Sequence, residues 1–180
     1  MDGKRVTHQD IQEKEFDHLF KILLLGHTTV GKTCLMLRFG EDKFVEQYNR
    51  TVSFDFRVRT INLFGLKIKL EIWDSHSTMK SSHFRSAHGI IILHDPSQPL
   101  DDLKLWLDEI DRYSLGYTIP KLIVASKCDL KNSEKIDGTK QLAEGLGITF
   151  MNISARDSIN CEECYVDLVC DVLKNLDNKW

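Results

Sequence analysis

Four short runs of continuous apolar residues, separated by segments of helical periodicity, constrain the fold of this 180-residue chain more than any other feature. The runs are "FKILLL" (20–25), "HGIIILH" (88–94), "PKLIVASK" (120–127) and "ITFMNIS" (148–154). Helices are expected over about 30–39, 100–113, 138–144 and 160–175. Strands that are apolar throughout are typical of a parallel sheet covered on both faces by helices. The pattern therefore predicts an α/β domain.

Two further segments alternate with a period of two residues and predict an antiparallel hairpin around Gly65. In "VSFDFRVRTIN" (52–62), the alternation places one set of apolar side chains toward the core: Val52, Phe54, Phe56 and Val58. In "LKIKLEIW" (66–73), it places Leu66, Ile68, Leu70 and Ile72 inward, and Trp73 on the polar face with Lys67, Lys69 and Glu71. The hairpin adds one antiparallel edge strand to the sheet.

Length and charge restrict the class of protein. A chain of 180 residues suits one domain, which we place at residues 16–180 after a polar, flexible N-terminal arm at 1–15. The net charge of −3 predicts no bulk attraction to nucleic acid or anionic lipid. No apolar run approaches the ~20 residues of a membrane helix, and no signal-peptide core is present, so a cytoplasmic location is expected. Cys161 and Cys164 form an isolated CxxC, which favours two residues of one helix over a zinc site.

The stretch "GHTTVGKT" (26–33) fits G-x-x-x-x-G-K-[ST], a phosphate-binding loop between a strand and a helix. Gly26 allows a sharp exit from the strand, and Gly31 lets main-chain N–H groups surround an anion. Lys32 supplies a positive charge over the outer phosphates, and Thr33 offers a hydroxyl to a magnesium ion. The N-terminus of the following helix favours the same anion. A glycine turn that only joins two elements is the alternative.

The stretch "SKCDL" (126–130) suggests which base would accompany the phosphates. A carboxylate at Asp129 can accept hydrogen bonds from both N1–H and the exocyclic amine of guanine, and adenine lacks that donor pair. The stem of Lys127 can lie across the ring, and the N–H of Ala155 can reach the guanine carbonyl.

In the order and spacing of these motifs, the chain resembles the Ras superfamily of small GTPases, and the Rab family most closely. The matching stretches are "GHTTVGKTCLMLRF", "TVSFDF", "LEIWD", "RSAHGIIILHD", "PKLIVASKCDL" and "ISAR". The resemblance implies a P-loop NTPase fold of the small-GTPase type. Its sheet would have six mostly parallel strands, one antiparallel edge strand and helices on both faces.

The resemblance also implies a set of site residues, with GTP or GDP and Mg²⁺ as the ligands. The implied nucleotide-binding residues are His27, Thr28, Thr29, Val30, Gly31, Lys32, Thr33, Cys34, Phe44, Thr51, Asp74, Ser126, Lys127, Asp129, Leu130, Ser154, Ala155 and Arg156. Those near magnesium would be Thr33, Thr51 and Asp74, and those near the reacting phosphate Lys32 and Thr51. Phe44 would stack on the guanine.

An effector protein is a further implied partner, through Phe56, Trp73 and His83. The alternation supports an outward Trp73, but it places Phe56 inward, so for Phe56 the two arguments disagree.

Departures from the family pattern concern hydrolysis and the nucleotide loops. Ser77 and Thr78 stand in place of the glycine that senses the γ-phosphate and the glutamine that orients water, in a shortened segment. Slow GTP hydrolysis is expected, because phosphoryl transfer depends on positioning; His76 or His83 is a possible substitute. Ser126 replaces an asparagine that ties the base loop to the phosphate loop, and it can make only one such bond.

Three readings remain open from the sequence. They are a slow GTPase switch, a non-hydrolysing nucleotide-binding scaffold, and an interaction domain that binds no nucleotide. The intact Lys32, Thr33, Thr51 and Asp74 argue against the third. Thr28 and Thr29 would crowd the approach of an activating arginine. The chain ends at "LKNLDNKW" without prenylation cysteines, so a peripheral endomembrane location would require a lipidated tail beyond this segment.

Overall fold

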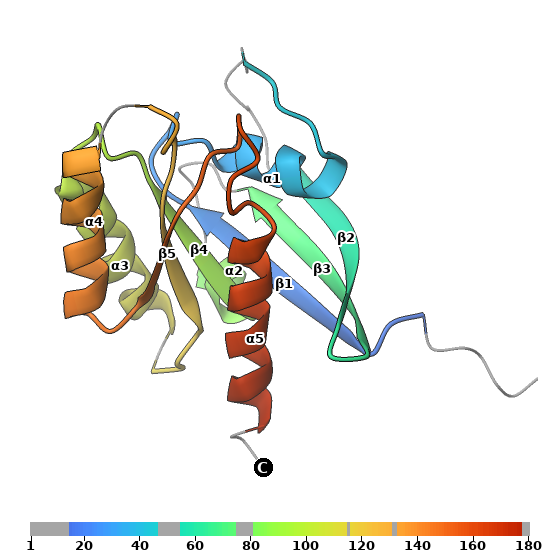
Figure 1. Ribbon diagram of the computed structural model, residues 1–180. Helices are drawn as coiled ribbons and strands as arrows, with labels where there is room; N and C mark the ends of the chain where they lie inside the picture. The colour runs from blue at the N-terminus through green and yellow to red at the C-terminus, as the bar shows by residue number, and fades with distance from the viewer. Residues whose placement is uncertain (1–14, 47–54, 75–80, 115, 131–132, 178–180) are drawn as a thin grey trace, which may run out of the picture.

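The computed structural model describes residues 15–46, 55–74, 81–114, 116–130 and 133–177. A six-stranded sheet of order β2-β3-β1-β4-β5-β6 forms its centre (Figure 1). The strands are β1 His18–Leu25, β2 Asp55–Leu63, β3 Leu66–Asp74, β4 Gly89–His94, β5 Lys121–Ala125 and β6 Thr149–Asn152. The helices are α1 Lys32–Glu41, α2 Ser81–Arg85, α3 Leu100–Ser114, α4 Ser133–Gly145 and α5 Glu163–Asp177.

All strand pairs are parallel except β2 with β3. This confirms the predicted mostly parallel sheet with one antiparallel edge strand. All six residues of β4 are buried, as expected for a central strand with helices on both faces.

Helices cover both faces of the sheet, and each layer has its own buried cluster (Figure 1). On one face, α1 and α5 contribute Met36, Phe39 and Tyr165, among others. On the other face, α2, α3 and α4 contribute Phe84, Ile110 and Ala143. The doubly covered α/β architecture predicted from the sequence is therefore confirmed.

The predicted orientation of β2 is wrong, whereas that of β3 is confirmed. Ile68, Leu70 and Ile72 of β3 are buried. In β2, however, Phe56 is 50% exposed and Val58 is 43% exposed. Val52 and Phe54 lie outside the described residues.

Arginine side chains occupy the helix-covered face of β2 in place of the predicted apolar ones. The Arg59 guanidinium carbon lies 4.3 Å from the centre of the Phe39 ring, and Arg59 donates a hydrogen bond of 2.8 Å to the Phe39 carbonyl. Arg57 pairs with Glu41 of α1 at 2.7 Å. Long arginine stems can cover apolar surface while their charged ends stay near water. The period-two pattern could not distinguish this arrangement from a conventional apolar inner face.

Helix boundaries differ from the sequence prediction at three places. The short helix α2 was not predicted. α4 begins at Ser133, five residues before the expected start, because Gly138 lies inside the helix and obscured its pattern. α5 begins at Glu163, after Ser158 and Asn160 in left-handed conformations.

The predicted arm at 1–15 lies outside the described residues except for Glu15. Just beyond it, the N–H of Asp17 donates to the Lys67 carbonyl at 2.7 Å, and the N–H of Lys67 donates to the Asp17 carboxylate at 2.8 Å. The chain is thus held beside β3 from this point. None of the described helices is both long enough and apolar enough to span a membrane.

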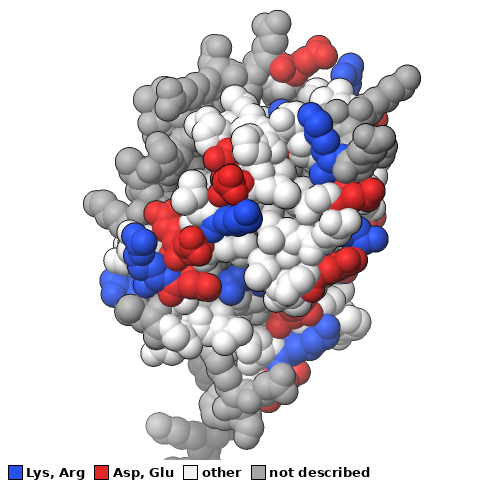
Figure 2. Space-filling model, turned by 90° about the vertical axis from the view of Figure 1, so that its left-hand side faces the viewer, with Lys and Arg blue, Asp and Glu red and all other residues white. Residues whose placement is uncertain are grey.

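Acidic and basic side chains alternate on the face shown in Figure 2, with uncharged residues between them. The described residues of this face therefore form no large patch of one sign.

Candidate functional site

The loop after β1 has the backbone geometry that its two glycines permit. Gly26 has a φ of 141°, and a Cβ there would lie 2.3 Å from the Leu93 carbonyl oxygen, so no other residue fits. Gly31 has a φ of 101° and is the N-cap of α1. The positive end of α1 therefore begins where the loop ends. Thr29, with a φ of 72°, is a β-branched residue in the left-handed region.

Lys32 closes this loop from within. Its buried side chain donates hydrogen bonds of 2.9 Å from Nζ to the carbonyls of Gly26 and His27. Burial lowers the pKa of Lys32, and the nearby Asp74 carboxylate partly offsets this effect. The loop thus holds a cation at its centre, where an anionic ligand would be attracted.

Thr33 and Asp74 meet beside Lys32. The Thr33 hydroxyl donates a hydrogen bond to Asp74 Oδ2. Asp74 is the buried last residue of β3, and its register position opposite Leu24 places it next to the start of the loop. Hydroxyl and carboxylate oxygens are the ligands that Mg²⁺ prefers, so these two residues fit a magnesium ion. Thr51, the third predicted ligand, lies outside the described residues.

Asp129 is held in place by the "ISAR" stretch. The Ser154 hydroxyl donates a hydrogen bond of 2.7 Å to Asp129 Oδ1 and accepts one of 3.0 Å from the Asp157 N–H. Lys127 Nζ forms an ion pair of 2.7 Å with the buried Asp95. These contacts fix both predicted base-contacting side chains after β5.

The Ser126 hydroxyl does not bond to the phosphate loop, the partner considered from the sequence, but to a neighbouring strand. Its hydroxyl donates to the His94 carbonyl at 3.2 Å, and its N–H donates to the same oxygen at 2.8 Å. The hydroxyl therefore extends the β4–β5 pairing, and its recorded bond does not reach the phosphate loop.

One cavity of about 660 Å³ joins the phosphate loop to the Asp129 region. This volume lies within the usual range for ligand pockets. The predicted residues that line it are Thr28, Thr29, Val30, Gly31, Lys32, Thr33, Cys34, Phe44, Ser126, Lys127, Asp129, Leu130, Ala155 and Arg156. The loops that carry them meet at the upper edge of the sheet in Figure 1.

Some predicted residues lie beside the cavity or outside the described part of the chain. His27 is exposed and hydrogen bonds to the Thr28 carbonyl at 3.0 Å. Ser154 and Asp74 do not line the cavity, but each hydrogen bonds to a residue that does. Ser154 bonds to Asp129, and Asp74 bonds to Thr33. His76, Ser77 and Thr78 are not described.

Sequence reasoning missed three lining residues, Val45, Glu46 and Ile153. Glu46 pairs with Arg156 at 3.6 Å across the cavity. Val45 and Glu46 directly follow Phe44, and Ile153 is the first residue of the "ISAR" stretch, so adjacency to predicted residues was the only available signal.

Comparison with known proteins agrees with this geometry. The sequence profile described as "Ras family" matches residues 21–174. The chain is also 41% identical over 170 residues to "GTP-binding protein YPTM1" of Zea mays, a match that covers 89% of this chain and 81% of that protein. The chain belongs to the Ras family. Within the Ras superfamily, it is a small GTPase of the Rab type.

The Rab-type chain places an aromatic pair on the face of the β2–β3 hairpin opposite to the one that α1 covers. Phe56 of β2 and Trp73 of β3 are opposite in register, and their rings stack with centroids 5.3 Å apart. Lys21 Nζ lies 4.3 Å from the centre of the Trp73 ring. His83 lies on α2. For Phe56, the position implied by the family resemblance was correct and the position implied by periodicity was not.

Proposed function

We propose that this chain is a molecular switch that binds GTP and GDP with Mg²⁺ and acts in vesicle traffic. The observation that carries the proposal is the single cavity lined by both Lys32 and Asp129. A cation held in a loop of main-chain groups suits a phosphate tail. A carboxylate oriented by Ser154 suits the paired N–H donors of guanine.

Magnesium would be held by Thr33 and Asp74, with Thr51 as the third predicted ligand. The ion would supply charge neutralisation of the phosphates when bound. The recorded contact between Thr33 and Asp74 supports this assignment, because it brings two oxygen ligands together beside Lys32.

We further propose that intrinsic GTP hydrolysis is very slow. The support is in the sequence: Thr78 and Ser77 replace the glutamine and glycine of the family pattern. A threonine side chain is too short to place water where a glutamine would, and a displacement of ~1 Å can cost about 100-fold in rate. The same substitution supports the second candidate, a nucleotide-binding scaffold that does not hydrolyse GTP.

An effector protein would bind the stacked pair of the exposed Phe56 and the partly buried Trp73, with His83 as a further predicted contact. Aromatic residues of this kind are enriched at protein interfaces.

We place the protein in the cytoplasm and peripherally on endomembranes. Replacing Phe56 with alanine should reduce GTP-dependent partner capture and leave GDP affinity unchanged. Equal capture of the partner by the unmodified chain and by the Phe56→Ala variant would refute the assignment of Phe56 to the effector surface.

Calorimetry on nucleotide-free protein tests the binding proposal. GDP and GTP should each release or absorb heat on titration, with higher affinity in the presence of Mg²⁺, and ATP should not bind. The Lys32→Ala variant should lose binding. The Asp129→Asn variant should prefer xanthine nucleotides, because an acceptor is exchanged for a donor. If folded protein binds no guanine nucleotide, the proposal fails.

Single-turnover hydrolysis separates the two candidate functions. Slow but measurable phosphate release from bound GTP favours the switch, whereas stable GTP without turnover favours the scaffold.

A further inference from the structure

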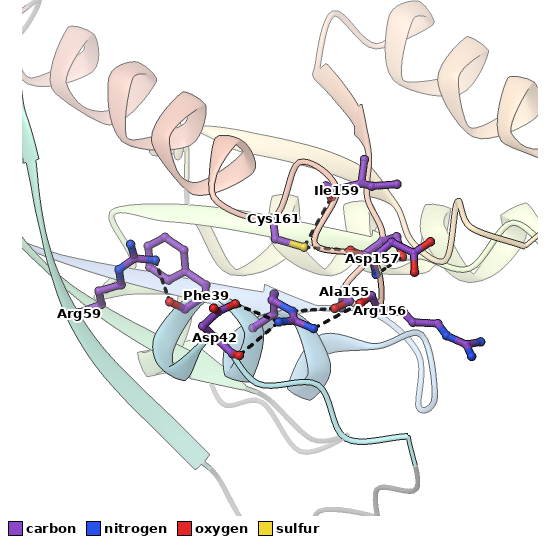
Figure 3. A network of polar contacts seen from close by, with 10 residues as sticks. Phe39, Asp42, Arg59, Ala155, Arg156, Asp157, Ile159 and Cys161 are labelled. Carbon is purple, nitrogen blue, oxygen red and sulfur yellow. Dashed lines mark hydrogen bonds and ion pairs between the residues drawn. The ribbon is translucent and has the colours of Figure 1, made fainter.

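Arg38 of α1 lies within the stretch "GHTTVGKTCLMLRF" but has no role among the site residues described above, and it contacts two other segments at the cavity. Its Nε donates a hydrogen bond of 2.8 Å to the Ala155 carbonyl, and its Nη2 donates one of 3.3 Å to the Arg156 carbonyl. Its Nη1 donates to Asp42, at 2.9 Å to Oδ1 and at 3.2 Å to the main-chain oxygen. Figure 3 shows this network, which joins residues 117 positions apart.

We propose that Arg38 is a positioning residue that holds the loop 154–157 and the segment leading to Phe44 around the base end of the cavity, and thereby slows nucleotide release. This inference rests on the proposed function, because it concerns the guanine nucleotide bound there.

The first step concerns the direction of the N–H groups in the loop. A peptide unit is planar and trans, so its N–H points opposite to its C=O. Arg38 draws the Ala155 carbonyl toward α1, and this directs the N–H of Arg156 away from α1. The Ser154 carbonyl is likewise held by the N–H of Ile159 at 2.9 Å and by Cys161 Sγ at 3.3 Å. Those bonds fix the N–H of Ala155. Since Ala155 and Arg156 line the cavity, a fixed loop presents fixed donors to a base.

The second step concerns the opposite wall of the cavity. Asp42 ends α1 in a left-handed conformation with a φ of 51°, and its N–H donates to the Arg38 carbonyl at 3.0 Å. Phe44 follows two residues later and lines the cavity. The same guanidinium therefore fixes the path of the chain into Phe44 and the loop that faces it.

The third step concerns the choice of side chain. The Arg38 side chain is 15% exposed, and its Nε bond to the Ala155 carbonyl is partly shielded from water, whereas its bonds to Asp42 and Arg156 lie at the surface. A planar guanidinium can serve several acceptors in fixed directions, whereas a lysine ammonium is a single point of donation. Lysine at this position would keep the positive charge but could not donate in several fixed directions at once.

Release of fluorescent mant-GDP from the full chain, with Mg²⁺ and excess GDP, tests the proposal. Arg38→Lys should speed release about tenfold, since hydrogen bonds from a charged donor to two carbonyls are lost. Arg59→Lys is the matched control. Arg59 donates to the Phe39 carbonyl at 2.8 Å and pairs with Glu162 at 3.0 Å, in the same region but with no recorded contact to residues 154–157. It should change release less than about twofold.

Two further measurements separate positioning from general stability. Affinity for inorganic pyrophosphate, which has no base, should stay unchanged in Arg38→Lys. Amide hydrogen exchange at residues 155–157 should be faster in nucleotide-free Arg38→Lys than in nucleotide-free wild type. If Arg38→Lys does not fold, Asp42→Asn replaces it, with a smaller expected acceleration of about threefold, because Asp42 is 87% exposed.

The proposal would be overturned if Arg38→Lys released GDP at the wild-type rate. It would also be overturned if the variant lost pyrophosphate affinity by the same factor as it accelerates GDP release. Absence of GDP binding by wild-type protein would instead refute the proposed function. In that case, unchanged exchange at residues 155–157 in the Arg38 variant would still refute the positioning role by itself.

Discussion

The Ser154 hydroxyl donates a 2.7 Å hydrogen bond to the carboxylate of Asp129, across 25 residues of sequence. Ser154 is fully buried, so the bond is not in competition with bulk water. It connects the loops after β5 and β6, whose strands are adjacent in the sheet. The carboxylate assigned to guanine is thus oriented before any ligand binds.

Replacing Ser154 with alanine should weaken GDP binding about tenfold or more, because a hydrogen bond to a charged acceptor contributes ~1.5–3 kcal/mol. Isothermal titration calorimetry measures the change. Ser158→Ala, in the same loop but exposed, is the control and should bind as wild type does. Unchanged affinity in Ser154→Ala would show that Asp129 does not need this partner.

Thr29→Gly should stabilise the nucleotide-free protein by about 1 kcal/mol. A non-glycine residue in the left-handed region costs ~1–3 kcal/mol, and the added backbone entropy of glycine offsets part of the gain. The expected rise in Tm is about 2–4 °C by calorimetry. Thr28→Gly is the control: Thr28 has no positive φ, so glycine there should lower Tm. A lower Tm for both variants would exclude strain at Thr29.

Asp95→Asn should make the acid limb of the stability curve less steep. Burial by itself would raise the pKa of Asp95, but hydrogen bonds from Lys127 and Ser97 outweigh it and lower the pKa. The folded value then lies below the unfolded one, so the contribution to stability is present above about pH 4 and is lost as the pH falls further. Urea unfolding between about pH 3 and 5 measures the slope. Equal slopes for both proteins would contradict the prediction.

Phe64→Asn should stabilise the β2–β3 hairpin. Phe64 and Gly65 both have positive φ, at 52° and 79°, and the Phe64 side chain is 79% exposed. Turns of this type favour asparagine before glycine. We expect a gain of roughly 0.5–1 kcal/mol by urea unfolding. Phe64→Ala, which keeps a side chain unsuited to positive φ, should bring no comparable gain.

Local patterns in the sequence were sufficient to identify the phosphate loop and every described element except the short helix α2. Continuous apolar runs identified β1, β4 and β5, since a buried central strand has no polar face, and a similar run identified β6 although it lies at the edge of the sheet. The spacing of Gly26, Gly31, Lys32 and Thr33 identified the loop, because each position has a local backbone or chemical requirement. Local pattern failed at β2, where it assigned Phe56 and Val58 to the core.

The sequence by itself determined the α/β class, the family and the residues that line most of the cavity. The class follows from hydrophobic periodicity and the phosphate loop from short-range spacing, whereas most of the other lining residues were implied by the resemblance to the family. Only the tertiary structure decided which face of β2 is open, where the Ser126 hydroxyl bonds, and that Arg38 holds a loop 117 residues away. Each of these depends on contacts between side chains and carbonyls of segments that are far apart in the sequence. Hydrophobic periodicity reports only which residues are apolar, so it cannot predict such contacts.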